Sequence, residues 1–380
     1  MENQISKKSV NFDMLISFAL LALLFIVLVV LEQILPRTSI LFTVLKKGAI
    51  YALVAVSMNL LNGFTGLFSL GQAGFMLLGA YTYAIFTIPV AARMQVYQYF
   101  NGGIIQFTLP VFVAMILAGL IAAGFAFLIG LPVLKLKSDY LAIATLGFAE
   151  IMRAIFQWDK IGVITNGSNL LRKYPVFKST TFYFAVSGIC IAVIVLLINS
   201  TYGRAFKAIR DDEVAAEAMG INLAHHKRLA FVISSFFAGI SGALLAMFQT
   251  TIQASQFKSA MTYEILLIVV IGGIGSITGS CISSFLFIAC SEWWLRFLDN
   301  ANLNLTSLQI LRPGFRKVVF SVVIMLIVLF YQKGIMGDKE FNLAYLIKFF
   351  KNLPSKISSM RSGKLKTQKD DASSVLKGEK

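Results

Sequence analysis

The stretch that decides the fold is residues 181–199, TFYFAVSGICIAVIVLLIN, which contains no charged side chain. A helix needs about 20 mostly apolar residues to cross roughly 30 Å of bilayer hydrocarbon, and this run has that length. Similar runs recur along the 380 residues, of which 57% are hydrophobic and 14% charged. Because an average soluble domain is about 25% charged, these runs indicate membrane spans and not a large soluble core. We therefore predict an all-α, polytopic bundle of transmembrane helices.

The same length criterion, applied along the chain, predicts about ten (8–10) spans. They form one transmembrane domain over residues 1–337. The junctions near 62–66 and 272–279 are short, so breaks in the backbone at membrane depth are the alternative there. The expected spans are 14–35, 40–61, 66–89, 109–132, 138–156, 181–199, 229–250, 262–280, 281–298 and 315–332.

The formal charge of +16 would suggest nucleic acid on a soluble chain. Here much of the excess lies in a basic tail, residues 338–380, where cytoplasmic Lys and Arg near anionic headgroups explain it. We predict the lipid bilayer as the surroundings, no nucleic-acid partner, and both termini in the cytoplasm. Within the tail, 341–353 suits a helix in the headgroup plane or a frayed continuation of the last span, and a disordered segment follows from Pro354.

A polar segment, residues 200–228, follows the opening stretch. Its sequence, STYGRAFKAIRDDEVAAEAMGINLAHHKR, holds four acids, five Lys or Arg and both histidines of the chain. The acids Asp211, Asp212 and Glu213 suit the positive end of a short helix, and Gly220 suits its C-cap. Such a helix, presented to the cytoplasm by two spans, predicts a docking element. A solvated loop that only orients the protein by its charge is the alternative.

No group of residues indicates catalysis. His225 and His226 are adjacent, so they diverge on a helix and chelate poorly, and the three cysteines lack metal-ligand spacing. The glycine run 272–279, GGIGSITG, lacks both the spacing of a Rossmann loop and the lysine of a P-loop. We predict no catalytic residue, no metal and no bound cofactor. An intramembrane enzyme is therefore disfavoured.

Charged residues inside the expected spans are few. Secondary transporters commonly need carboxylates or an ion site near the membrane midplane. A local ion pair across one helical turn explains Glu150 and Arg153. If the chain moves a solute uphill, we expect the energy to enter from a partner. A transporter or channel that works alone is the alternative.

A possible solute path is suggested by residues 62–83, NGFTGLFSLGQAGFMLLGAYTY, which are rich in small side chains. Close helix packing explains the glycines. A polar lining of a path explains Gln72 and Thr145 about as well as packing does. The candidate path residues are Ser69, Gly71, Gln72, Gly74, Thr145 and Glu264.

Several separated motifs resemble a known family. They are GRAFKAIRDDEVAAEAMGIN at 203–222 with KRLAFVISSFFAGISGALLA at 227–246, GLFSLGQAGFMLLGAY at 66–81, SDYLAIATLGFAEIMR at 138–153, EILLIVVIGGIGSITG at 264–279 and YQKGIMG at 331–337. These motifs are similar to those of the membrane-spanning permeases of bacterial branched-chain amino acid ABC importers, specifically the M-type subunit. The resemblance covers roughly residues 40–337.

The resemblance implies a bacterial cytoplasmic-membrane protein with several partners. These are a homologous H-type permease, two cytoplasmic ATPases that bind ATP and Mg²⁺, and an extracytoplasmic solute-binding protein that delivers leucine, isoleucine or valine. Relatives of this class carry urea, other amino acids or sugars, so another small polar solute is the alternative.

The resemblance also implies that the polar segment couples the permease to its ATPases. Its spacing departs from the EAA-x-x-x-G loop of other importers, because Glu213 precedes Gly220 by seven residues and not six. The implied coupling residues are Gly203, Arg210, Asp211, Asp212, Glu213, Ala216, Glu217 and Gly220.

Overall fold

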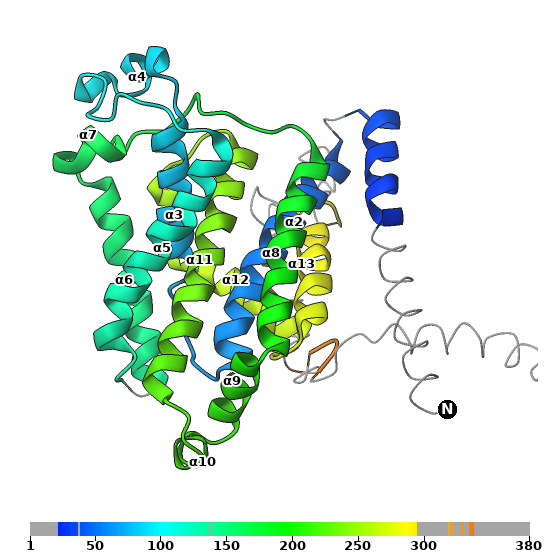
Figure 1. The fold of residues 1–380 in the computed structure, drawn as a ribbon. Helices are drawn as coiled ribbons and strands as arrows, with labels where there is room; N and C mark the ends of the chain where they lie inside the picture. The colour runs from blue at the N-terminus through cyan, green and yellow to red at the C-terminus, as the bar shows by residue number, and fades with distance from the viewer. Residues whose placement is uncertain are drawn as a thin grey trace, which may run out of the picture. The chain divides into compact units, whose positions relative to one another are not determined.

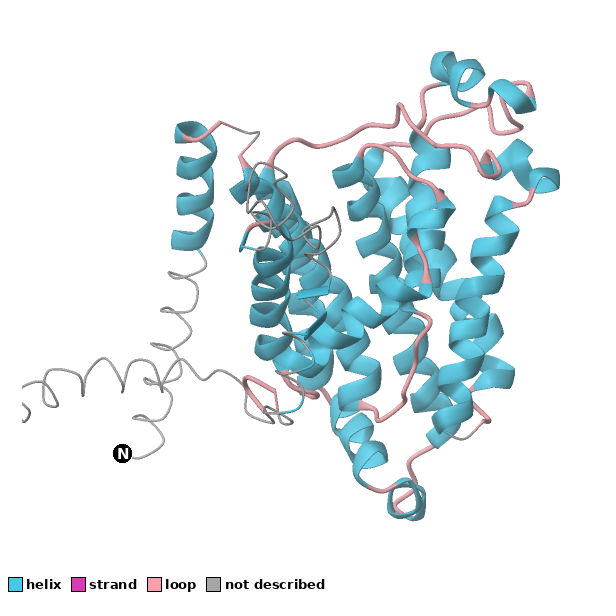
Figure 2. Ribbon diagram, turned by 180° about the vertical axis from the view of Figure 1, so that it is seen from behind, coloured by secondary structure: helices cyan, strands magenta, loops and turns pink. Residues whose placement is uncertain are grey.

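The computed structural model describes residues 22–36, 39–136, 138–294 and 334–337, with isolated positions at 318, 319, 321, 322, 325 and 329. These residues form helices and loops without a strand; one isolated bridge pairs Leu171 with Ile252 (Figures 1 and 2). The prediction of an all-α helical bundle is therefore confirmed. The described residues from Leu28 onward pack as one compact unit. The expected span 315–332, the start of the span 14–35 and the tail 338–380 lie outside the continuously described residues.

Two sets of helices build this unit. The longer ones are α2 (Ile40–Asn59), α3 (Gln72–Thr87), α5 (Val111–Val133), α6 (Ser138–Gln157), α8 (Thr180–Asn199), α11 (Leu223–Gln249), α12 (Ser259–Gly272) and α13 (Ile277–Glu292). The shorter ones are η1 (Leu60–Phe64), α4 (Val90–Val96), η2 (Gln98–Phe100), η3 (Asp159–Ile161), α7 (Gly162–Thr165), α9 (Thr201–Asp211), α10 (Glu213–Ala218) and η4 (Ala254–Gln256).

Five described helices are long and apolar enough to cross a bilayer. They are Ile40–Phe64, Val111–Val133, Tyr140–Gln157, Thr180–Asn199 and Leu223–Gln249. Three shorter apolar helices join them: Ala22–Ile34, Ser259–Gly272 and Ile277–Glu292. The protein is thus built as a multi-pass membrane bundle.

Two predicted span boundaries are clearly wrong. The expected span 66–89 becomes helical only at Gln72, because the chain is unwound before α3. The expected boundary between residues 280 and 281 falls inside α13, and the chain breaks instead between Gly272 and Ile277. Gly273 and Gly275 have φ values of 113° and 91°, which glycine adopts without steric cost, so the turn forms there. The alternative of a break within 272–279 is therefore confirmed.

Helices α3 and α11 form the centre of the unit. In the apolar stretch of α11, 78% of the residues are buried. In that of α8 only 28% are buried, so most of its apolar side chains are left for lipid. A Cβ added to Gly79 of α3 would lie 2.0 Å from the carbonyl oxygen of Gly239 of α11. One added to Gly242 would lie 2.0 Å from the carbonyl oxygen of Met76. Small residues therefore let the two backbones touch, as is common between membrane helices.

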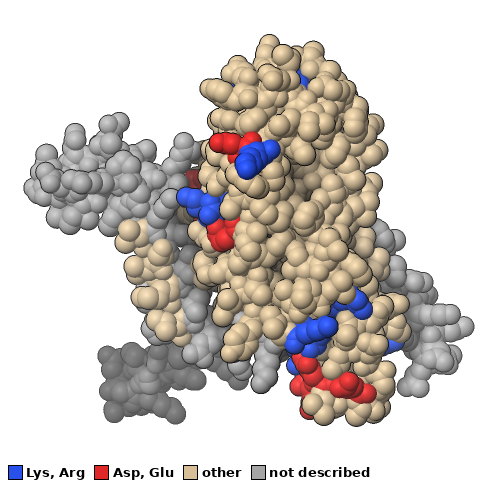
Figure 3. All heavy atoms as spheres, turned by 90° about the vertical axis from the view of Figure 1, so that its left-hand side faces the viewer, with Lys and Arg blue, Asp and Glu red and all other residues tan. Residues whose placement is uncertain are grey.

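Both ends of the unit carry charged side chains, but Arg93 at one of them is buried. Helices α4 and α7 lie at one end, and α9 and α10 at the other (Figure 1). At the α4 end, the buried Arg93 guanidinium donates to the carbonyls of Ile85 (3.1 Å) and Phe107 (2.8 Å), and burial lowers its pKa. On the face in Figure 3, Lys, Arg, Asp and Glu gather visibly over α9 and α10. Arg93 therefore serves the folding of its own loop, while the polar segment carries exposed charge.

We expect Gly79→Val to destabilise the protein by about 3 kcal/mol, at the upper end of overpacking costs, because the new side chain meets the α11 backbone. The thermal unfolding of purified protein in detergent measures this. Gly124→Val is the matched control, since a Cβ at Gly124 meets nothing within 4 Å. Equal melting temperatures for the two variants would contradict the close approach of α3 and α11.

Candidate functional site

An unwound segment, residues 65–71, enters the interior of the bundle. It follows η1, a π-helical turn at the end of α2, and runs to the start of α3 inside the bundle (Figure 1). Leu67, Ser69 and Gly71 are buried. Non-helical backbone at membrane depth is tolerated only where protein or a water-filled cavity satisfies its polar groups. The partners of this backbone therefore define a candidate site.

Side chains from α6 and η1 hold the unwound segment. The Ser69 N–H donates to Asn62 Oδ1 at 3.1 Å, and the Leu70 N–H donates to Thr145 Oγ1 at 3.0 Å. Gly71 lies against the same threonine, since an added Cβ would be 3.2 Å from Thr145 Cβ. The structure thus brings the predicted path residues Ser69, Gly71 and Thr145 together.

Gln72 begins α3 beside this cluster. Its side chain is 1% exposed, and Nε2 donates to Ser234 Oγ of α11 at 3.0 Å. Its Oε1 is buried and meets no donor among the described residues. The next N–H, of Ala73, donates to Thr262 Oγ1 of α12 at 3.2 Å. Helices α3, α11 and α12 therefore meet at one polar point, where the Oε1 atom of Gln72 has no donor among the described residues.

The two remaining path candidates lie differently. Gly74 packs tightly on α6, where an added Cβ would be 2.8 Å from Ala149 Cα. Glu264 is exposed on α12 and interacts with Tyr51 of α2. Gly74 thus adjoins the cluster through backbone packing, while Glu264 is not among the residues that hold the unwound segment. The role of all six residues in a path stays a prediction.

Asn59, at the end of α2, holds the second break in the chain. It is fully buried, and its Nδ2 donates to the Ser276 carbonyl at 2.9 Å and to Ser280 Oγ at 2.8 Å. Its Oδ1 accepts the N–H of Gly275 at 2.8 Å. The sequence interpretation missed this residue. A lone amide in the apolar run 40–61 was the signal that could have found it.

Glu150 has a wider role than the predicted local ion pair. The pair is confirmed, with Arg153 Nη2 2.5 Å from Glu150 Oε2. Glu150 Oε1 also accepts the Ser259 N–H at 3.1 Å and the Ser259 hydroxyl at 2.5 Å. A carboxylate is stabilised at a helix N-terminus, so Glu150 fastens α6 to the first turn of α12.

The polar segment folds as two helices and the start of a third. We predicted one short helix; the basic stretch before the acids is a separate helix, α9. The Asp212 side chain caps α10 by accepting the N–H groups of Val214 (2.8 Å) and Ala215 (3.1 Å). We had expected Asp211 at the start of the helix that is now α10. It is instead the last residue of α9. The predicted C-cap is one residue late: Met219 is the C-cap of α10, and Gly220 follows it with a φ of 83°, the left-handed conformation in which helices commonly end.

The predicted coupling residues divide into an inner and an outer set. Gly203 and Ala216 are buried. Arg210 is 38% exposed, but its guanidinium reaches inward to the carbonyl of Gly63 at 3.2 Å. Asp211, Asp212, Glu213, Glu217 and Gly220 are exposed, as are the apolar side chains Val214 (79%) and Met219 (84%). A hollow between α9 and α10 is lined by Arg204, Ala205, Ala208, Asp211, Ala215 and Met219, among others. The outer set, together with Val214 and Met219, therefore forms an exposed surface with protruding apolar side chains beside acidic ones.

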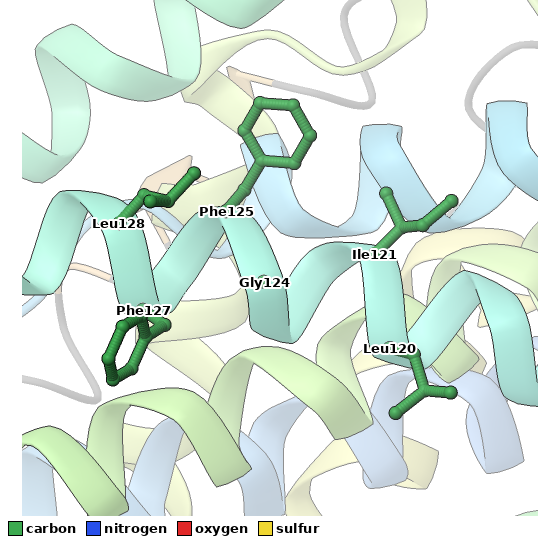
Figure 4. A pocket seen from close by; sticks show the side chains of 6 residues that line it. All are labelled: Leu120, Ile121, Gly124, Phe125, Phe127 and Leu128. Atoms are coloured by element: carbon green, nitrogen blue, oxygen red, sulfur yellow. The ribbon is translucent and has the colours of Figure 1, made fainter.

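A second hollow on α5 has a different character. Leu120, Ile121, Phe125, Phe127 and Leu128 line it around Gly124 (Figure 4). These side chains offer no hydrogen-bonding group. The hollow therefore suits lipid tails and lies apart from the polar cluster at Gln72.

The chain matches the family model described as branched-chain amino acid transport system / permease component over residues 40–331. It belongs to this permease family. The match covers the unwound segment, the polar segment and both helices of the second break. The recognised motifs and the polar geometry thus lie within the same part of the chain.

Named relatives fall into two groups. The chain is 30% identical over 296 residues to the high-affinity branched-chain amino acid transport system permease protein LivM of Salmonella typhimurium, covering 69% of this chain and 65% of the relative. It is 24% identical to the probable LivM of Methanocaldococcus jannaschii (76% and 91% covered). It is 26% identical to the LivH permease of Salmonella typhimurium (81% and 98%). The chain thus spans about two thirds of the first relative. No solved structure matches it.

We expect Asn59→Ala to destabilise this permease by about 3 kcal/mol, because buried groups at Gly275, Ser276 and Ser280 lose their partner. Thermal unfolding in detergent measures the loss. Asn199→Ala is the matched control, since Asn199 is exposed at the end of α8. If both variants melt at the wild-type temperature, the second break does not depend on Asn59.

Proposed function

We propose that this chain is a permease subunit of an ATP-driven importer of branched-chain amino acids. The observation that carries the proposal is the polar segment, which joins an exposed surface on α10 to the interior of a membrane bundle. The relatives named LivM and LivH are described as branched-chain amino acid transport permeases, which supports the substrate class. In this proposal ATP and Mg²⁺ bind to partner ATPases, and this chain holds neither.

Two further partners complete the proposed transporter. Similarity to both LivM and LivH supports pairing with a homologous H-type permease. A solute-binding protein would deliver the amino acid at the α4 end. The α10 end and both termini would then face the cytoplasm of a bacterial cell, as cytoplasmic loops rich in Lys and Arg favour.

The outer set of the polar segment is the proposed ATPase-docking surface. Val214 projects from the six-residue helix α10 and Met219 from its C-cap, and the caps fix the direction of the helix. Exposed apolar groups gain free energy when a partner buries them, at about 25 cal/mol per Å². Glu217 and Asp212 flank them, so the complementary surface would be apolar with basic edges.

The cluster at Gln72 is the proposed part of the solute path. An amino acid carries an ammonium group, which can donate to the buried Oε1 of Gln72. Urea also carries N–H donors, so this acceptor alone does not distinguish the two solutes. Uptake measurements are therefore needed to separate them.

We expect Met219→Asp to weaken the binding of the ATPases, because it places a charge where an apolar side chain should be buried. The change should reduce by about tenfold or more the ATPase retained on affinity-purified permease, about 1.4 kcal/mol in binding. Met94→Asp is the matched control, since Met94 is also exposed (67%) but lies on α4. Normal retention of ATPase by Met219→Asp would show that α10 is not the docking surface.

We expect Gln72→Leu to lower the uptake of radiolabelled leucine by the assembled transporter about tenfold, because it removes the buried acceptor at similar volume. Gln106→Leu, at an exposed outer position, is the control and should leave uptake unchanged. Unaltered uptake by Gln72→Leu would remove this residue from the path.

The same assay decides the solute. Excess unlabelled isoleucine or valine should compete with leucine, and urea should not. Uptake of urea without uptake of leucine would replace the proposed substrate while leaving the transporter architecture in place.

A further inference from the structure

Arg210 links the exposed polar segment to the interior. It lies in the last turn of α9, and its Nη1 donates to the carbonyl oxygen of Gly63, in η1, at 3.2 Å. Its Nε and Nη2 donate to Asp211 Oδ1 at 3.0 and 2.9 Å. One planar guanidinium thus binds a carboxylate on the segment and a carbonyl in the membrane bundle. Such a fork is available to arginine and not to lysine.

Both breaks in the chain meet this side chain. Gly66, at the start of the unwound segment, has a φ of 73°, and a Cβ there would lie 3.1 Å from Arg210 Cγ. Gly275, in the second break, has a φ of 91°, and its Cβ would lie 3.4 Å from Arg210 Nη1. A Cβ on Gly63 would lie 2.5 Å from the Gly275 nitrogen, so the two breaks also touch each other.

The rest of α9 restrains Arg210. Phe206 and Ile209 are buried at 0% and 1% exposure and anchor the helix in the bundle. One turn before Arg210, the Lys207 ammonium lies 5.7 Å from the ring centre of Phe64 in η1. A displacement of α9 therefore acts directly on η1 and on the unwound segment that follows it.

We propose that Arg210 is a positioning residue that transmits movement of the α9–α10 pair to both helix breaks. This inference rests on the proposed function, in which ATPases move α10. It assigns Arg210 to the inner side of the coupling segment and not to the docking surface. The unwound segment, residues 65–71, and the polar cluster beside it would then shift when Arg210 does.

The test uses the complete transporter in proteoliposomes. We expect Arg210→Lys to retain the ATPases and to hydrolyse ATP within about twofold of wild type, while leucine uptake falls about tenfold, a typical size for coupling between sites. Loss of ATPase retention in step with uptake would make Arg210 a docking residue and overturn the inference. So would unchanged uptake.

A second variant approaches the contact from the other side. Gly66→Val places a branched side chain against Arg210 without touching the outer surface of α10, and should uncouple hydrolysis from uptake in the same way. Arg204→Lys, on the same helix at the hollow between α9 and α10, is the control and should not uncouple them. Full coupling in Gly66→Val transporter that elutes as a single complex would overturn the inference.

A readout without substrate separates this inference from the proposed function. Phe68 is 39% exposed in the unwound segment, so Phe68→Cys can be labelled with a maleimide after the native cysteines are replaced by alanine. ATP should change the labelling rate, and Arg210→Lys should abolish that change. If ATP alters labelling but leucine is not transported, the proposed substrate fails and the inference stands. The inference is overturned if ATP does not change the labelling rate, or if ATP changes it equally with Arg210 and with Arg210→Lys.

Discussion

The structure depends on one constraint: backbone N–H and C=O groups inside a bilayer must find partners within the protein. Regular helices satisfy it internally, but this chain interrupts two of them. Side chains then replace the missing helical bonds, with Thr145 and Asn62 at the first break and Asn59 at the second. Because these bonds are specific in direction, each break has a defined geometry. Buried polar side chains with partners on other segments therefore gather at the two breaks.

The same constraint explains why the two breaks behave as one element. Asn59 ends the helix that leads into the first break, and its amide binds the backbone of the second. Arg210 then joins the first break to α9 and lies against the second. A surface helix, two breaks and a buried polar cluster are thus connected by short contacts. Coupling over distance requires an element with discrete arrangements, and unwound backbone held by few bonds is suited to that role.

Hydropathy predicted the helices that face lipid and failed where the backbone departs from a helix. The stretch 181–199 matches α8 within one residue at its start, because every position in it is compatible with one uninterrupted helix. Residues 262–298 are almost as apolar, so length alone put the boundary near 280, although positive φ at Gly273 sets it earlier. Asn59 escaped notice because its importance lies in partners more than 200 residues away. In the polar segment, the acidic residues correctly indicated the start of α10. The helix α9 was missed because the burial of Phe206 and Ile209 against the bundle, which accompanies it, is not visible in the sequence.

The bonding of Glu150, a carboxylate in the membrane helix α6, is that of a structural contact and not of an ion-exchange site. An ion-coupled transporter needs a carboxylate whose partners change as the ion binds and leaves. Glu150 instead has both oxygens engaged, one by Arg153 and the other by the first turn of α12, so it fastens two helices together. Exchanging an ion there would release α12 from α6 and expose a helix end. Arg210 differs from Glu150, because its side chain is 38% exposed and it donates to the carbonyl of Gly63 in η1, next to the unwound segment. The exposed surface of α10 and the polar cluster at Gln72 are thus connected through Arg210, η1 and the unwound segment.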